Sequence, residues 1–389
     1  MLYCEINNER LKERKDNMIY LDYNATTPID KEVADAMIPY MYGNFGNPSS
    51  SHEYGKIAKQ AVEHARTEVA DLLHCLQNEI IFTSGGSESN NTVIKGVAYT
   101  YRHKGDHIIT SKIEHPAVLN PCDYLERLGY KISYLPVKEN GMVDVSALEE
   151  MITDRTILVT IMHSNNETGT LQPIKDIAQI CHKHNILVHT DASQSVGKVP
   201  IDVNDLDVDF LTIAGHKLYA PKGIGALYVN RKISIEPLIH GAGHELGRRA
   251  GTENVIFDVA LGKACQLAQK ALQNDHLQEL TKYFYLSLKE IFGEKMHLNG
   301  DLNNKLPNTL NISFLGYNGN EILELLGDDI AASTGSACHS GLISISPVLK
   351  EMKVPIDIAR GAVRFSLGRF TTKEDVDTVL ERFRKMENQ

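Results

Sequence analysis

The segment from residue 157 to residue 192 alternates between two kinds of pattern: ILVTIMH (157–163), IKDIAQICHKH (174–184) and ILVHTDA (186–192). The first and third pieces are short apolar runs, which are typical of buried strands, whereas the middle piece repeats apolar residues at helical spacing. Two strands that are joined by a helix are expected to run parallel, because a parallel connection needs a crossover of a dozen or more residues. This stretch therefore predicts one unit of an α/β domain with a mostly parallel sheet.

The same alternation continues on both sides of this unit. Helix-like patterns and loops separate four further apolar runs, EIIFTSGG (79–86), HIITS (107–111), DFLTIAGHK (209–217) and GIGALYV (223–229). Before them, one apolar stripe recurs at helical spacing and predicts a helix with one buried face: Ile57, Ala61, Ala65, Val69 and Leu72. The fold class expected is a large domain with a mostly parallel sheet flanked by helices.

The pattern changes from about Leu267 onwards. A long polar helix precedes shorter strands, NTLNISF (308–314) and AVRFSLG (362–368), and the chain closes on an amphipathic helix, TTKEDVDTVLERFRKM (371–386). Thr372 is the expected N-cap of that helix. With 389 residues the chain exceeds one compact core, and we predict a tail (1–17), a large domain (31–268) and a smaller α+β domain (18–30 and 269–389).

Composition excludes several classes of protein. The formal net charge of −10 argues against a nucleic-acid partner, which needs a basic surface, and no stretch approaches the ~20 apolar residues that span a bilayer. Six cysteines without CxxC pairs, and an N-terminus without the apolar core of a signal peptide, predict reduced thiols and a cytoplasmic location. CHKHN (181–185) does not predict a metal site, because His182 and His184 face different sides of a helix.

Three groups that follow predicted strands suit one cofactor. Gly86 and Ser87, in IIFTSGGSESNN (80–91), open a helix whose N–H groups could hold a phosphate. Asp191 ends one strand and Lys217 follows another; alone, they are better explained as a helix cap and a surface lysine. Together they match pyridoxal 5′-phosphate, whose phosphate needs the cradle, whose aldehyde needs an amine and whose ring nitrogen needs a carboxylate.

Ten motifs of the sequence occur in the order that one known enzyme family shows. From Met18 onwards the sequence closely resembles the NifS/IscS group of cysteine desulfurases and the related selenocysteine lyases, which are class V aminotransferase-type enzymes of pyridoxal-phosphate fold type I. The motifs that carry this resemblance are YLDYNATTP, GNPSSSH, FTSGGSESNN, EHPAVL, NNETG, HTDASQS, GHKLYAPKGIGALY, RRAGTEN, GSACHSG and VRFSLGRFTT.

The resemblance implies roles around the cofactor. Lys217 would bind the aldehyde carbon, Asp191 would pair with the ring nitrogen, and Gln194 would hydrogen-bond the phenolic oxygen. His115 would stack on the ring and assist proton transfer. The phosphate would be held by Gly86, Ser87 and His216, and by Thr252 of a neighbouring subunit, which implies a homodimer with shared active sites.

Substrate and sulfur roles follow from the same resemblance. Asn166 would contact cofactor and substrate, and Arg364 would clamp the carboxylate of L-cysteine. Cys338, in STGSACHSG (333–341), would take the sulfur as a persulfide, release alanine and pass the sulfur to a protein acceptor such as an iron–sulfur scaffold or a thiolation enzyme. Ala214 is a departure, since many relatives carry a phosphate-binding serine there.

Two alternatives stay open at this point. A selenocysteine lyase would use the same cofactor and fold, and an apolar residue at the Ala214 position fits it as well. A non-catalytic scaffold of the same fold would be expected to have lost Lys217, Asp191 or Cys338, and all three remain.

Overall fold

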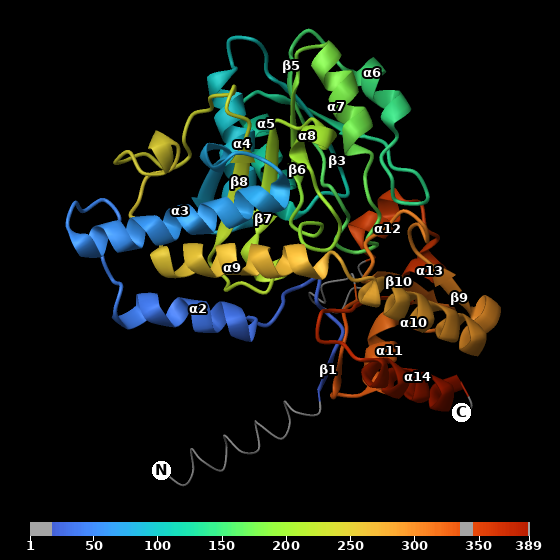
Figure 1. Ribbon diagram of the computed structural model, residues 1–389. Helices are drawn as coiled ribbons and strands as arrows, with labels where there is room; N and C mark the ends of the chain where they lie inside the picture. The colour runs from blue at the N-terminus through green and yellow to red at the C-terminus, as the bar shows by residue number, and fades with distance from the viewer. Residues whose placement is uncertain (1–17, 335–344, 388–389) are drawn as a thin grey trace.

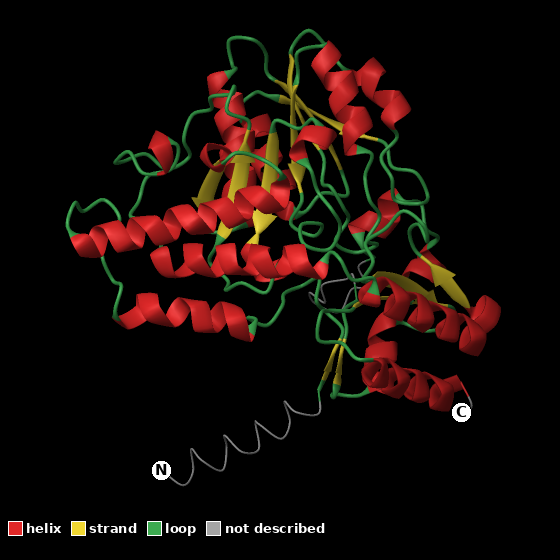
Figure 2. Ribbon diagram, in the orientation of Figure 1, coloured by secondary structure: helices red, strands yellow, loops and turns green. Residues whose placement is uncertain are grey.

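A seven-stranded sheet lies at the centre of the larger part of the molecule (Figures 1 and 2). The computed structural model describes residues 18–334 and 345–387, so the predicted tail (1–17) and Cys338 lie outside the described residues. The strand order is β2-β8-β7-β6-β5-β3-β4. Their bounds are β2 Ile80–Thr83, β3 His107–Ser111, β4 Lys131–Leu135, β5 Thr156–Thr160, β6 Leu187–Asp191, β7 Phe210–Ala214 and β8 Gly225–Val229.

The sheet is mostly parallel, which confirms the predicted fold class. The pairs β4–β3, β3–β5, β5–β6 and β6–β7 run parallel, and only β8 is antiparallel to both of its neighbours, β7 and β2. All six apolar runs predicted as strands are strands. The edge strand β4 was not predicted, because Lys131 and Ser133 interrupt its apolar pattern at the sheet edge.

Helices cover both faces of this sheet (Figure 1). Alternate strand residues pack on opposite faces of the sheet. Ile80 and Phe82 pack with α2, α3, α7 and α9 on one face, whereas Ile81 packs with α4 and α5 on the other. The predicted stripe on α3 is buried apart from Ile57, which is partly exposed. The helices of this part are α2 Lys31–Tyr42, α3 Glu53–Leu73, α4 Gly86–Thr100, α5 Pro116–Arg127, α6 Leu148–Met151, α7 Ile174–Lys183, α8 Val203–Leu206 and α9 Val255–Ala271.

A second core lies beside the first, around a three-stranded antiparallel sheet of order β12-β10-β9. The predicted C-terminal helix is confirmed: the four apolar residues of its stripe are buried, and Thr372 Oγ1 accepts a hydrogen bond from Asp375 N at 3.1 Å. The elements here are β9 Met296–Leu298, β10 Thr309–Phe314, β12 Ala362–Ser366, α10 His276–Phe292, α11 Gly319–Leu326, α12 Pro347–Glu351, α13 Ile356–Ala359 and α14 Lys373–Glu387.

The first described residues belong to this second core. The short strand β1 (Ile19–Tyr20) pairs with β11 (Ile330–Ala331), and Leu21 is buried among the residues of the second core. Two separate cores support our division of the chain into a large domain (31–268) and a small domain (18–30 and 269–389), which we keep as a proposal. No helix in the described part of the chain combines the length and hydropathy needed to cross a membrane.

Candidate active site

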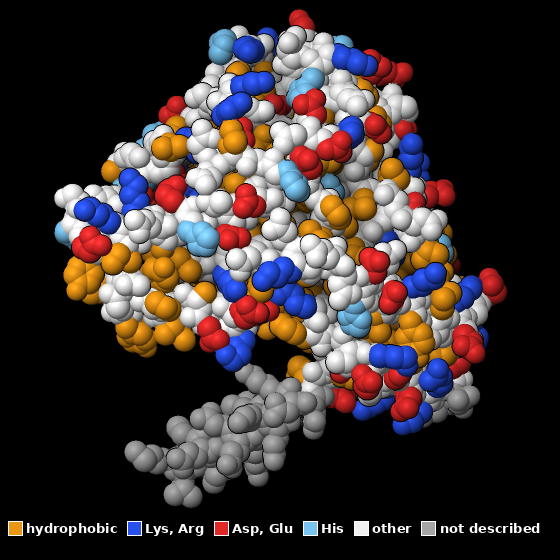
Figure 3. All heavy atoms as spheres, viewed as in Figure 1, with side chains coloured by type: hydrophobic (Ala, Val, Ile, Leu, Met, Phe, Trp, Pro, Cys, Tyr) orange, Lys and Arg blue, Asp and Glu red, His pale blue; other side chains and the backbone are white. Residues whose placement is uncertain are grey.

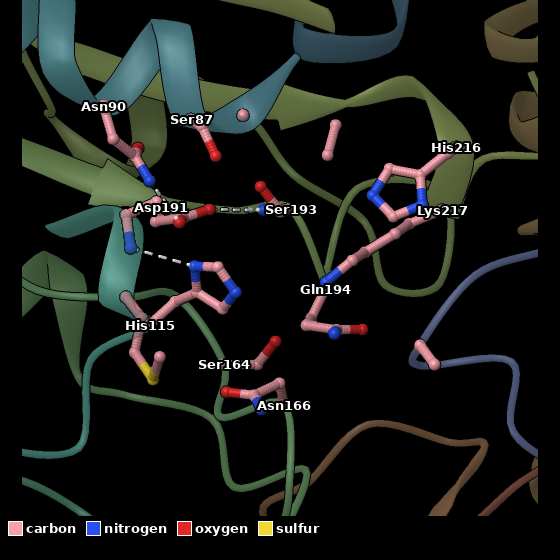
Figure 4. A pocket seen from close by; sticks show the side chains of 15 residues that line it. Ser87, Asn90, His115, Ser164, Asn166, Asp191, Ser193, Gln194, His216 and Lys217 are labelled. Atoms are coloured by element: carbon pink, nitrogen blue, oxygen red, sulfur yellow. Dashed lines mark hydrogen bonds between the residues drawn. The ribbon is translucent and has the colours of Figure 1, made fainter. Parts of the chain in front are cut away.

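A cavity of about 170 Å³ opens where β6 and β7 end and α4 begins (Figure 4). This is the edge where open parallel sheets place their ligands, because all the parallel strands present their carboxyl ends there. Eight of the predicted site residues line it: Gly86, Ser87, His115, Asn166, Asp191, Gln194, His216 and Lys217. Residues far apart in sequence are therefore brought together as the site predictions require.

The start of α4 forms one wall of the cavity. Gly85 has φ +148°, a conformation that residues with a side chain rarely adopt. A Cβ on Gly86 would lie 3.0 Å from Ser193 Oγ and 3.4 Å from Ala214 Cβ, so a side chain there would crowd the wall. The free N–H groups of the first helical turn, next to the Ser193 hydroxyl, suit an anion. Ser193, which also lines the cavity, was missed by the sequence analysis.

The Asp191 carboxylate is buried and held by two donors. Asn90 Nδ2 donates to Asp191 Oδ2 at 2.7 Å, and the backbone N–H of Ser193 donates to Asp191 Oδ1 at 3.0 Å (Figure 4). Asn90 Oδ1 is buried without a hydrogen-bond partner in the described part of the chain. This carboxylate suits a protonated nitrogen. Asn90 was also missed, although it follows Gly86 by one helical turn and so shares its face.

Lys217 extends from the 3₁₀ turn after β7 into the middle of the cavity (Figure 4). Burial lowers the pKa of Lys217 to about 8; Asp191 opposes this shift and Arg364 adds to it. A larger share of uncharged amine at neutral pH makes Lys217 a better nucleophile toward a carbonyl than an exposed lysine.

Two histidines flank Lys217. His115 caps α5, and its Nδ1 accepts a hydrogen bond from Ala117 N at 3.1 Å. The neutral ring therefore carries its proton on Nε2. Burial and the charge of Lys217 lower the pKa of His115, and the same causes lower the pKa of His216 to about 4. His216 Nδ1 lies 3.1 Å from Thr26 Oγ1. Both rings are neutral at physiological pH.

Arg364 lies behind the wall of the active-site cavity rather than in it. It does not line the cavity, but its Nη1 donates to the backbone oxygen of Asn166 at 2.9 Å, and its Nη2 contacts Asp22 Oδ1 at 2.6 Å. Its Nε is buried without a hydrogen-bond partner among the described residues. The guanidinium thus keeps an unused donor beside Asn166, whose side chain does line the cavity.

Two predicted residues are not in the cavity wall. Thr252 is exposed between the 3₁₀ turn Glu245–Gly247 and α9, and it does not line the cavity of its own chain. Cys338 lies outside the described residues. Within the described part of the chain, no group of three or more His, Cys, Asp or Glu side chains is placed to hold a metal ion.

Comparison with known proteins agrees with this arrangement. The chain is 48% identical over 366 residues to the cysteine desulfurase IscS of Dictyoglomus turgidum, covering 93% of each protein. It is 49% identical over 370 residues to that of Methanosarcina thermophila, covering 94% of this chain and 91% of the relative.

Solved structures agree as well. A NifS-like protein superposes with a TM-score of 0.89 at 38% identity, covering 95% of this chain and 99% of the other. The structure of SspA in complex with cysteine gives a TM-score of 0.79 at 39% identity, covering 91% and 100%. The family model for aminotransferase class V matches residues 19–379. On these grounds the chain belongs to the class V aminotransferase family.

Proposed function

We propose that this protein is a cysteine desulfurase, which uses pyridoxal 5′-phosphate to convert L-cysteine to L-alanine and keeps the sulfur as a persulfide on Cys338. The observation that carries the proposal is the meeting of Lys217, Asp191 and the N-terminus of α4 in one cavity. Both curated relatives described above are cysteine desulfurases, and one structural neighbour is in complex with cysteine.

The residues present fit this cofactor. The turn at Gly86 leaves room beside the helix start for a phosphate, and Ser193 Oγ offers a hydroxyl where Ala214 offers none. Asp191 would accept from the ring nitrogen, Gln194 would donate to the phenolic oxygen, and Lys217 Nζ would bind the aldehyde carbon. When bound, pyridoxal phosphate supplies an electron sink that weakens the Cα–H and Cβ–S bonds of the substrate.

The chain's own groups would then move the protons. Lys217 Nζ, which is mostly uncharged above its lowered pKa of about 8, takes the proton from the substrate Cα. Asp191 is held in place by hydrogen bonds from Asn90 and from the backbone N–H of Ser193. His115, neutral and protonated on Nε2, can exchange a proton with the substrate.

The sulfur step needs a reactive thiolate. The Cys338 thiolate attacks the substrate sulfur, the Cβ–S bond breaks, and its electron pair returns to the carbon skeleton that leaves as alanine. The four described cysteines suit this role poorly, because burial raises the pKa of each thiol, to about 12 for Cys75, Cys122 and Cys181.

Arg364 and Asn166 would bind the amino-acid substrate. A carboxylate at Arg364 would compete with Asp22 for the guanidinium and could use the free Nε, and the contact between Arg364 and the Asn166 backbone would keep the two aligned.

A homodimer is part of the proposal. Apolar side chains gather where α2 ends and α3 begins (Figure 3). They are exposed although large: Ile38, Met41, Tyr42, Phe45 and Tyr54. Such a patch suits burial by a second copy, which would let Thr252 reach the partner's phosphate site. The sulfur acceptor would be a protein, such as an iron–sulfur scaffold.

Alanine release tests the function. We would incubate the purified protein with L-cysteine and, in parallel, with L-selenocysteine, with and without added pyridoxal phosphate. Alanine from L-cysteine that depends on the cofactor is the expected result. Alanine from selenocysteine alone would make the enzyme a selenocysteine lyase, and alanine from neither would overturn the enzymatic assignment.

A further inference from the structure

Lys198 is a half-buried lysine that the proposed chemistry does not use. It lies four residues after Gln194, and it lines a second, larger cavity of about 700 Å³. Lys217 lines this second cavity as well as the active-site cavity, so the two cavities meet at the cofactor-binding lysine. Lys198 therefore stands directly behind the active site.

Lys198 is held by neutral oxygens. Its Nζ donates to Gln194 Oε1 at 3.1 Å and to Asn24 Oδ1 at 3.0 Å. In the described part of the chain no carboxylate pairs with it, and the charged groups that act on it, Lys217 and Arg364, are both cations. Burial and these two cations hold the pKa of Lys198 well below its usual value.

The surrounding contacts fix which way the Gln194 amide points. Gln194 Nε2 donates to the backbone oxygen of Asn24 at 2.9 Å, which can only accept. At the other end of the amide, Lys198 Nζ donates to the oxygen of Gln194. The two contacts require the same orientation of the Gln194 amide. The second N–H of Gln194 can then donate to a group in the cavity, which Gln194 lines.

Asn24 is itself locked in place. Its Nδ2 donates to Thr309 Oγ1 at 2.9 Å and to the backbone oxygen of Asn166 at 3.3 Å, so its Oδ1 must face Lys198. Lys198 thus bridges two amide oxygens that come from different parts of the chain.

We infer that Lys198 is a positioning residue, which holds the Gln194 amide with its N–H toward the phenolic oxygen of bound pyridoxal phosphate. This inference rests on the proposed function, because it needs the cofactor in the cavity. A fixed donor at the phenolic oxygen favours the ionised oxygen. Without Lys198, Gln194 Oε1 loses this donor, and only the hydrogen bond from Gln194 Nε2 to the backbone oxygen of Asn24 still opposes a turn of the amide oxygen toward the cavity.

The test is a pH titration of the bound cofactor by its absorbance. Lys198→Met removes the donors and keeps the unbranched side chain, and Lys198→Arg restores a donor-only group. Lys198→Leu is measured alongside as a second variant that has no donor. Lys305→Met is the matched control, because Lys305 lines the same cavity and donates to the backbone oxygens of Leu306 and Thr309, with no contact to Gln194.

The midpoint of the absorbance change should rise by about one pH unit in Lys198→Met. Lys198→Arg and Lys305→Met should stay at the wild-type midpoint. In a Gln194→Leu background, Lys198→Met should cause no further shift, which a general loss of packing would not explain.

The experiment distinguishes a failure of the proposed function from a failure of the inference about Lys198. A wild-type protein that binds no pyridoxal phosphate would overturn the proposed function and this inference with it. A wild-type protein that binds it normally, with an unshifted midpoint in whichever of Lys198→Met and Lys198→Leu folds, would overturn this inference alone. Equal shifts in Lys198→Met and Lys305→Met would also contradict it.

Discussion

The two sides of the active-site cavity are built differently. On one side, Asp191 and Lys217 end or follow strands of the large sheet, and Gly86 opens the helix after another strand. On the other side, Arg364 comes from the small sheet, and its Nη1 donates to the backbone oxygen of Asn166, 198 residues away in sequence. The first side is set by the sheet alone, whereas the second depends on the contact between two cores.

This difference separates two functions. The sheet side carries the groups proposed to bind the cofactor, and the other side carries those proposed to bind the amino acid. Changes on the sheet side should therefore abolish or alter cofactor chemistry. Changes on the other side should weaken substrate binding and leave the bound cofactor as it is.

The largest effect is expected at Lys217. Lys217→Ala should lower alanine formation from L-cysteine by about 10³-fold or more, because it removes both the point of attachment and the base. Alanine formation and the mass of the protein after reduction with borohydride measure this. The unfolding temperature serves as the control for folding, and near-normal turnover by Lys217→Ala would contradict the role.

A smaller effect, on the other side, is expected at Arg364. Arg364→Gln should raise KM for L-cysteine about 10–100-fold, because hydrogen bonds to a charged group are lost, while the cofactor absorbance stays unchanged. Arg360→Gln, on an exposed arginine nearby, is the control. If Arg364→Gln lost the cofactor and kept KM, the division between the two sides would be wrong.

Asn90→Ala should act on the sheet side more mildly. Asp191 would lose one of its two donors, so kcat should fall about tenfold with little change in KM. Asn91→Ala is the matched control, because Asn91 donates only to the backbone oxygen of Ser87. Equal loss in both variants would indicate damage to α4 rather than an effect on Asp191.

The smallest effect is a pH dependence of cofactor uptake. Burial lowers the pKa of Lys217 to about 8, so below this pH the amine is protonated and cannot attack an aldehyde. The uptake rate of the cofactor-free protein should rise about tenfold per pH unit up to about pH 8 and then level off. An increase that continues to about pH 10 would mean that Lys217 titrates as an exposed lysine.

Sequence predicted the sheet side better than the other side, for a physical reason. Apolar runs mark strands, and a polar residue at the end of such a run lies at the functional edge of a parallel sheet, so Asp191 and Lys217 could be found directly. Asn90 and Ser193 needed the structure, because a polar residue in the first turns of a helix, or in the turn after a strand, looks like an ordinary solvated position.

The contacts that hold the other side could not be predicted from local pattern. Asn24 and Lys198 act through hydrogen bonds to residues distant in sequence, and no periodicity connects them. The family resemblance implied roles for Arg364 and Asn166, but the hydrogen bond that joins them comes from the packing of the two cores. Thr252, Cys338 and the domain boundaries stay predictions.

The most direct test of the account is the mass of the protein after one turnover. Wild-type protein loaded with pyridoxal phosphate and mixed with L-cysteine should gain the mass of one sulfur atom on the peptide that contains Cys338, and Cys338→Ser should gain none. Sulfur on the peptide of Cys75, or equal alanine formation by Cys338→Ser without added thiol, would contradict the assignment of Cys338 as the sulfur carrier.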